Sequence, residues 1–108
     1  MDDLRKVYEG RDDVQIVDCR EQWEWDAGRI EGAVLIPLNQ LMSGAGGDVL
    51  DQSKKTYVVC RTGNRSELAT MMLRARGFDA ENMEGGMELW SRLGLPFTAP
   101  DGSPGRVA

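Results

Sequence analysis

Short apolar runs, separated by polar segments that contain glycine, recur along the chain. The clearest run is Thr56–Val59, where every residue is β-branched or aromatic, and it predicts a buried strand. Val14–Val17 and Val34–Ile36 predict two more strands, and Pro37 ends the second because proline cannot donate to a sheet ladder. Ala80–Met83 predicts a weaker fourth strand.

The segments between these runs favour helices that end at glycine, and Asp2 and Asp3 supply the negative charge that favours the start of the first helix. Because strands alternate with helices at short intervals, the pattern predicts an α/β fold, a parallel sheet flanked by helices on both faces. The helix after the third strand is expected to bury Leu68, Met72 and Ala75. The expected helices are Asp2–Glu9, Glu21–Asp26, Arg65–Arg76 and Met87–Leu93.

The length of 108 residues suits one domain. We expect this domain to span residues 1–95. Residues 96–108 predict a polar, flexible C-terminal tail, because beyond Pro96 this segment holds Pro100, Gly102, Pro104 and Gly105 and has little apolar content. Since the longest apolar run is Ala33–Ile36, no membrane partner is expected.

Composition excludes several classes of chemistry. The chain contains no histidine and only 2 cysteines, so a Ser-His-Asp triad, a histidine metal site and a four-cysteine zinc site are all ruled out. We therefore expect neither metal nor cofactor. The net charge of −5 argues against nucleic-acid binding, which depends on neutralising phosphates. Two cysteines without an export signal predict a cytoplasmic protein with free thiols.

Cys60 follows the strongest strand directly, and residues 60–66 (Cys-Arg-Thr-Gly-Asn-Arg-Ser) lead into a helix. Such a loop can turn successive backbone N–H groups inward as an anion-binding nest, and Gly63 permits a positive φ there. The arginines at 61, 65, 74 and 76 make this segment locally positive. Without an imidazole base, a thiolate must be stabilised electrostatically, and this loop is suited to that task. The alternative is a buried structural cysteine.

Residues 60–66 resemble the active-site loop of the rhodanese family of sulfurtransferases, C-R-x-G-x-R-S. The resemblance covers about residues 4–95, with four motifs in the same order and spacing. Its other three parts are Asp18-Cys19-Arg20-Glu21 (D-x-R-E), Glu24-Trp25 followed by Gly28-Arg29-Ile30-Glu31-Gly32-Ala33 (E-[WY]-x-x-G-H-I-x-G-A), and Gly85-Gly86-Met87-Glu88-Leu89-Trp90 (G-G-x-x-x-W).

The chain departs from the family pattern in three ways. Arg29 stands where the family usually has histidine, and Cys19 stands where a small aliphatic residue is usual. We expect the edge strand that usually opens the fold to be absent. We expect Cys19 to be an apolar filler that points into the core. The alternative is a resolving thiol that attacks a Cys60 persulfide and closes a disulfide.

The resemblance implies a thiosulfate sulfurtransferase with Cys60 as the catalytic nucleophile. Its partners would be a small-molecule sulfur donor and a thiophilic acceptor, cyanide or a thiol, with a sulfur-accepting protein as a further possibility. The implied substrate-binding residues are Arg61, Thr62, Gly63, Asn64 and Arg65, and the implied supporting residues are Asp18, Arg20 and Ser66.

Several assignments stay open at this level. Arg65 either contacts the donor or ties the loop to an acid, and Asp18 with Arg20 either positions the loop or forms a local capping pair. A cysteine phosphatase is a weaker alternative, because phosphatases use C-x5-R and this chain has C-x4-R. A non-catalytic rhodanese module that binds a partner protein, and a sulfur relay to a protein acceptor, are further alternatives.

Overall fold

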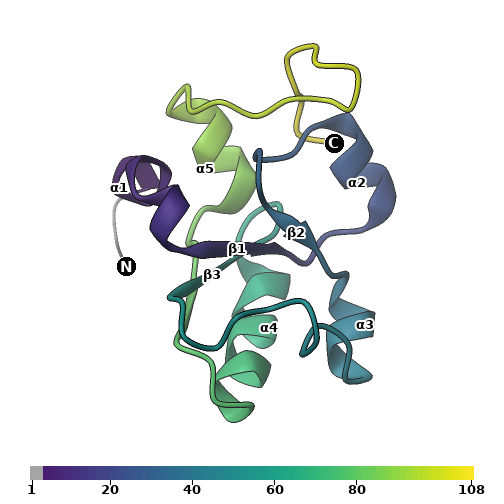
Figure 1. The fold of residues 1–108 in the computed structure, drawn as a ribbon. Coiled ribbons are helices and arrows are strands. Elements are labelled where there is room, and N and C mark those ends of the chain that lie inside the picture. The colour runs from purple at the N-terminus through teal and green to yellow at the C-terminus, as the bar shows by residue number, and fades with distance from the viewer. Residues whose placement is uncertain (1–3) are drawn as a thin grey trace.

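A parallel sheet of four strands lies at the centre of the molecule (Figure 1). The computed structural model describes residues 4–108. The strand order is β2-β1-β3-β4, so β1 and β3 are the interior strands. Asp18 at the end of β1 is in register with Val59 at the end of β3. The strands are β1 (Gln15–Asp18), β2 (Val34–Leu35), β3 (Thr56–Val59) and β4 (Ala80–Asn82).

Helices cover both faces of this sheet, as the alternating pattern predicts. The described segment contains helices α1 (Leu4–Glu9), α2 (Gln22–Ala27), α3 (Leu38–Met42), α4 (Asn64–Ala75) and α5 (Gly86–Arg92), and a short 3-10 helix, η1 (Arg11–Asp13). α1 and α5 lie on one side of the sheet, and α3 and α4 on the other (Figure 1). The longest, α4, has 12 residues. Within residues 4–108, no helix has the length and apolar character needed to cross a bilayer.

The alternation of side chains along the strands divides the core into two layers. On β3, Tyr57 and Val59 point to one layer, which contains the fully buried Trp90 of α5. Val58 points to the opposite layer, which α3 and α4 cover. Cys19 and Cys60, one residue beyond β1 and β3 respectively, both belong to this second layer.

The predicted elements are present, with differences in detail. Residues 1–3, including the start of the helix expected at 2–9, lie outside the described part. The five-residue helix α3 is not expected from the sequence, because it is too short to show helical periodicity. The predicted buried side of α4 is wrong. Leu68 is exposed, and the helix instead buries Ser66, Ala69, Thr70 and Leu73.

The C-terminal segment also differs from the loosely packed tail that its composition suggests. Thr98 exchanges two backbone hydrogen bonds with Arg29, of 2.9 and 3.0 Å. The Arg106 amide donates to the carbonyl of Ala27 at the end of α2. Phe97 and Val107 pack against the core layer of α1 and α5. Composition could not reveal this, because the segment is held by backbone hydrogen bonds and by contacts remote in sequence.

Candidate active site

The sulfur of Cys60 lies at the centre of the loop between β3 and α4. It accepts hydrogen bonds from the amide of Gly63 at 3.1 Å and from the amide of Ser66 at 3.4 Å. The Ser66 hydroxyl lies 3.3 Å from the same sulfur. Gly63 has φ of 119°, a left-handed conformation that favours glycine, and this turn points its amide at the sulfur. The loop is therefore the anion-binding nest that its sequence predicts.

This environment lowers the pKa of Cys60 to about 4, well below the ordinary value for a thiol. The largest cause is the neighbouring Cys19 side chain. Burial opposes the effect, while Ser66 and the Gly63 amide add to it. The pKa of Cys19 is raised, chiefly because of the neighbouring Cys60 sulfur and then because of burial. Of the two thiols, Cys60 is therefore the more acidic.

We expect Cys60 to react with iodoacetamide with a rate midpoint several pH units below that of free cysteine, roughly 8.5. Because the pKa of Cys60 is lowered, its thiolate forms as pH rises through about 4. The alkylation rate therefore rises with pH in that range and is already at its plateau by neutral pH. Burial of Cys60 slows the reaction at every pH but leaves the midpoint unchanged, because only the ionised fraction depends on pH.

Site-resolved mass spectrometry across a pH series measures this midpoint. Cys19 is the internal control, because its raised pKa and burial predict slow alkylation throughout. A Cys60 midpoint at or above that of free cysteine would contradict the assignment.

Contacts from α5 and β4 hold the loop, and sequence reasoning assigned them no role. The Met87 amide donates to the carbonyl of Cys60 at 2.9 Å. A Cβ at Gly86 would overlap the Cys60 carbonyl oxygen, so this close approach requires glycine. Asn82 donates from Nδ2 to the Gly63 carbonyl at 3.1 Å, and its Oδ1 lies 2.5 Å from the Ser66 hydroxyl. One feature of the sequence could have pointed to Asn82: it is a polar residue at the end of β4, the strand beside the one that leads to Cys60.

Arg65 ties the loop to an acid, the second of the two alternatives for this residue. Its guanidinium donates to both carboxylate oxygens of Glu24, at 2.6 and 2.8 Å. Glu24 is buried on α2 and also accepts from the Glu21 amide. Burial favours a raised pKa for Glu24, but Arg65 and the Glu21 amide together lower it. The Arg65–Glu24 pair therefore joins the loop to α2 as a charged contact.

The remaining arginines of the positive segment have different surroundings. Arg74 donates to the Ala80 carbonyl, and Arg76 donates to the Leu41 carbonyl, so both serve to hold the fold. Arg61 is half exposed, with its Nε 3.6 Å from a carboxylate oxygen of Glu88. Arg61 is thus the loop cation best placed to meet a ligand from solvent.

Asp18 and Arg20 form a buried pair behind the site. The guanidinium of Arg20 donates to both carboxylate oxygens of Asp18, the shortest bond being 2.8 Å, and neither side chain is exposed by more than 1%. Burial raises the pKa of Asp18, and Arg20 opposes that rise. Arg20 also donates to the Gly28 carbonyl at 2.8 Å, beyond the end of α2. The pair thus anchors α2, which carries the Glu24 partner of the loop.

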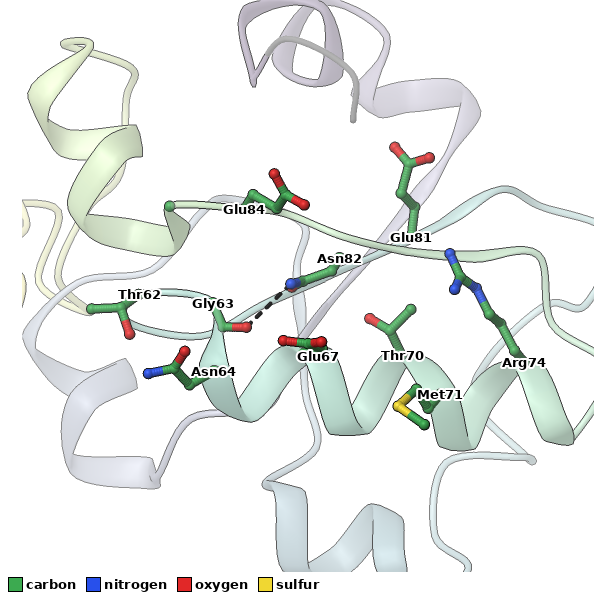
Figure 2. Close-up of a pocket in the computed structure, with 11 residues that line it drawn as sticks. Thr62, Gly63, Asn64, Glu67, Thr70, Met71, Arg74, Glu81, Asn82 and Glu84 are labelled. Atoms are coloured by element: carbon green, nitrogen blue, oxygen red, sulfur yellow. Dashed lines mark hydrogen bonds between the residues drawn. The ribbon is translucent and has the colours of Figure 1, made fainter.

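A cavity of about 640 Å³ opens beside the loop, between α4 and β4 (Figure 2). Loop residues 62–64, three of the predicted binding residues, line one end, and Thr62 and Asn64 are exposed there. Its lining also includes three acidic side chains, Glu67, Glu81 and Glu84, against the single cation of Arg74. These carboxylates disfavour an anion, so this cavity does not suit an anionic sulfur donor.

The fold and the loop together define a class: an α/β domain that holds a cysteine within a nest of backbone amides, at the carboxyl end of an interior strand. A family model described as Rhodanese-like domain matches residues 2–93. The chain therefore belongs to the family of rhodanese-like domains, as its four motifs indicate.

Relatives in other organisms support this assignment. A protein named "Sulfurtransferase" from Allochromatium vinosum is 32% identical, over 84% of this chain and 84% of its own length. The Mycobacterium tuberculosis protein named "Probable adenylyltransferase/sulfurtransferase MoeZ" is 34% identical, over 87% of this chain but only 24% of its own length. The crystal structure of a rhodanese-related protein from Thermoplasma volcanium superposes with a TM-score of 0.79 at 31% identity, covering 87% of this chain and 92% of that one.

Proposed function

We propose that this domain is a sulfurtransferase that carries sulfane sulfur as a persulfide on Cys60. The Cys60 thiolate attacks the outer sulfur of thiosulfate, the S–S bond of the donor breaks, and sulfite leaves with the bonding electron pair. Cyanide or a thiolate then attacks the terminal sulfur of the persulfide, which regenerates the Cys60 thiolate and releases thiocyanate or a new persulfide. The charge balances at each step, and no external oxidant is needed.

One observation supports this proposal above the others: the Cys60 sulfur accepts hydrogen bonds from the Gly63 and Ser66 amides. Because the chain has no histidine to act as a base, these amides are what stabilises a thiolate. These amides stabilise negative charge on sulfur both before attack and when the thiolate is regenerated, as an oxyanion hole does for oxygen. A thiolate nucleophile works only while reduced, so we place this chemistry in the cytoplasm.

The test is incubation with thiosulfate, followed by intact and peptide mass spectrometry. We expect one added sulfur, located on Cys60, that cyanide removes with release of thiocyanate. A matched incubation with an aryl phosphate tests the phosphatase alternative. An unmodified Cys60, or faster hydrolysis of the aryl phosphate than reaction with thiosulfate, would overturn the proposal.

Arg61 is proposed to bind the sulfonate of the donor, because it is half exposed and lies next to the nucleophile. We expect Arg61→Ala to raise KM for thiosulfate about tenfold, with a smaller change in kcat, since one exposed charge contact is lost. Arg61→Lys should recover part of the loss. Arg92→Ala removes an exposed arginine on α5 and serves as the control. Equal KM values for Arg61→Ala and Arg92→Ala would contradict this role.

A protein acceptor is the second candidate for the last step. One relative named above joins sulfurtransferase with adenylyltransferase in its name, and this chain spans about a quarter of its length. That arrangement supports a sulfur relay, in which Cys60 passes its terminal sulfur to an activated protein instead of to cyanide. A non-catalytic binding module is less well supported, because such a role does not require a low-pKa cysteine.

A further inference from the structure

Cys19 is a second buried thiol to which the proposed sulfur transfer assigns no role. It lies one residue beyond β1, and its amide donates to the carbonyl of Val59 at 3.0 Å. This bond continues the parallel register that pairs Asp18 with Val59, so Cys19 lies alongside Cys60. Side chains in register on neighbouring parallel strands, about 4.8 Å apart, point to the same face.

Both thiols are enclosed in an apolar environment. Each is 1% exposed, and both belong to the core layer that includes Val17, Val58 and Ala69. A charge on sulfur in such a layer is costly unless hydrogen-bond donors surround it. The donors available to the Cys60 sulfur therefore decide whether it is ionised.

The hydrogens available beside the Cys60 sulfur favour Cys19 over Ser66 as such a donor. The Ser66 hydroxyl carries one hydrogen but lies near two acceptors, the Cys60 sulfur at 3.3 Å and Asn82 Oδ1 at 2.5 Å. The amide nitrogen of Asn82 is committed to the Gly63 carbonyl, which fixes Oδ1 toward Ser66. The short contact places the hydroxyl hydrogen on the Asn82 side, and this leaves the thiol hydrogen of Cys19 for Cys60.

We propose that Cys19 is a positioning residue of the sulfur-transfer site, whose S–H group donates to the Cys60 sulfur and holds that sulfur in its reactive thiolate form. The inference rests on the proposed function, and it changes the role expected for Cys19. Cys19 packs in the core as a filler would, but its hydrogen bond acts on the nucleophile itself.

The surroundings explain why the proton stays on Cys19. The Cys60 sulfur accepts hydrogen bonds from two backbone amides. The neighbours of Cys19 instead include the carboxylate of Asp18, which adds to the rise in the pKa of Cys19. Arg65 favours charge on either sulfur but is paired with Glu24. From β4 and α5, the groups that contact the loop are the uncharged Asn82, the Met87 amide and the half-exposed carboxylate of Glu88, which pairs with Arg61 at 3.6 Å. A thiol that keeps its proton is a poor nucleophile, so Cys19 acts as a donor and not as a resolving thiol.

The experiment compares the pH midpoint of Cys60 alkylation in the wild-type chain, Cys19→Val and Cys19→Ser. Valine fills a similar volume without a donor, whereas serine keeps a donor. We expect Cys19→Val to raise the midpoint by about one to two pH units, and Cys19→Ser to stay within about half a unit of wild type. Ile36→Val, a mild change in the same core layer, is the packing control and should leave the midpoint unchanged.

The same variants are then assayed with thiosulfate from acidic to alkaline pH. Cys19→Val should form the Cys60 persulfide more slowly at low pH and recover as pH rises, a pattern that loosened packing alone does not produce. If Cys19→Val does not fold, Cys19→Ala takes its place in both assays.

The two ways of failing are distinguishable. An unshifted midpoint in the folded donor-free variant, or an equal shift in Cys19→Ser, overturns the role of Cys19 even where persulfide forms normally. If Cys19→Val shifts the midpoint as expected but the wild-type chain forms no persulfide from any sulfane donor, the proposed function is overturned instead.

Discussion

Replacing Cys60 with serine is expected to lower the transfer of sulfur from thiosulfate to cyanide by about 10³-fold or more, with the fold retained. A serine hydroxyl is not ionised near neutral pH and cannot form a persulfide. The donors that face this position, the Gly63 and Ser66 amides, can bond to a hydroxyl oxygen as they do to sulfur. We therefore expect Cys60→Ser to lower the rate of sulfur transfer and to leave the stability of the fold unchanged.

Thiocyanate formation and intact mass measure this loss, and thermal unfolding checks the fold. Ser53→Ala, which changes an exposed serine in the turn at Asp51, is the control for a serine-sized change away from the loop. Cys60→Ser with wild-type turnover would show that the sulfur is carried elsewhere.

Replacing Asp18 with asparagine is expected to cost about 3–5 kcal/mol of unfolding free energy. The change leaves the guanidinium of Arg20, which is fully buried, without its counter-charge. Domains of this kind have roughly 5–15 kcal/mol of stability in total, so the variant should be close to unfolding at room temperature. Sulfur transfer should fall with it, because Arg20 also holds the end of α2 at the Gly28 carbonyl.

Urea unfolding followed by tryptophan fluorescence, to which the buried Trp90 contributes, measures this cost. Asp79→Asn is the matched control, since it breaks an exposed ion pair with Lys55 of 3.3 Å and should cost less than about 1 kcal/mol. Combining Asp18→Asn with Arg20→Met should restore part of the stability, because it removes the uncompensated charge. Equal costs for Asp18→Asn and Asp79→Asn would contradict a structural role for the buried pair.

Local residue patterns were sufficient for much of the fold. The strand Thr56–Val59 has the predicted bounds, because four successive β-branched or aromatic residues favour a buried strand in any context. The other strands and the long helix agree with the predictions to within one residue at each end. The side of α4 that faces the core was mispredicted, because polar Ser66 and Thr70 are buried there, where their hydroxyls donate to Asn82 Oδ1 and to the Ser66 carbonyl.

The cysteine loop was equally predictable, because its parts are contiguous. Cys60, Gly63 and Ser66 lie within seven residues, and a positive φ at a glycine before a helix turns the amides toward the sulfur whatever the rest of the chain does. Sequence by itself thus determined the backbone nest around the Cys60 sulfur and the α/β class.

Tertiary structure alone decided what surrounds that loop. Arg65 meets Glu24 across 41 residues, and Cys19 reaches Cys60 only through the register of β1 with β3. Asn82 takes the Ser66 hydrogen only because β4 lies next to β3. Such contacts depend on strand order and register, which no local pattern specifies, since a slip of one residue would turn each side chain to the other face of the sheet. The proton on Cys19, and with it the charge on Cys60, is therefore a property of the folded chain.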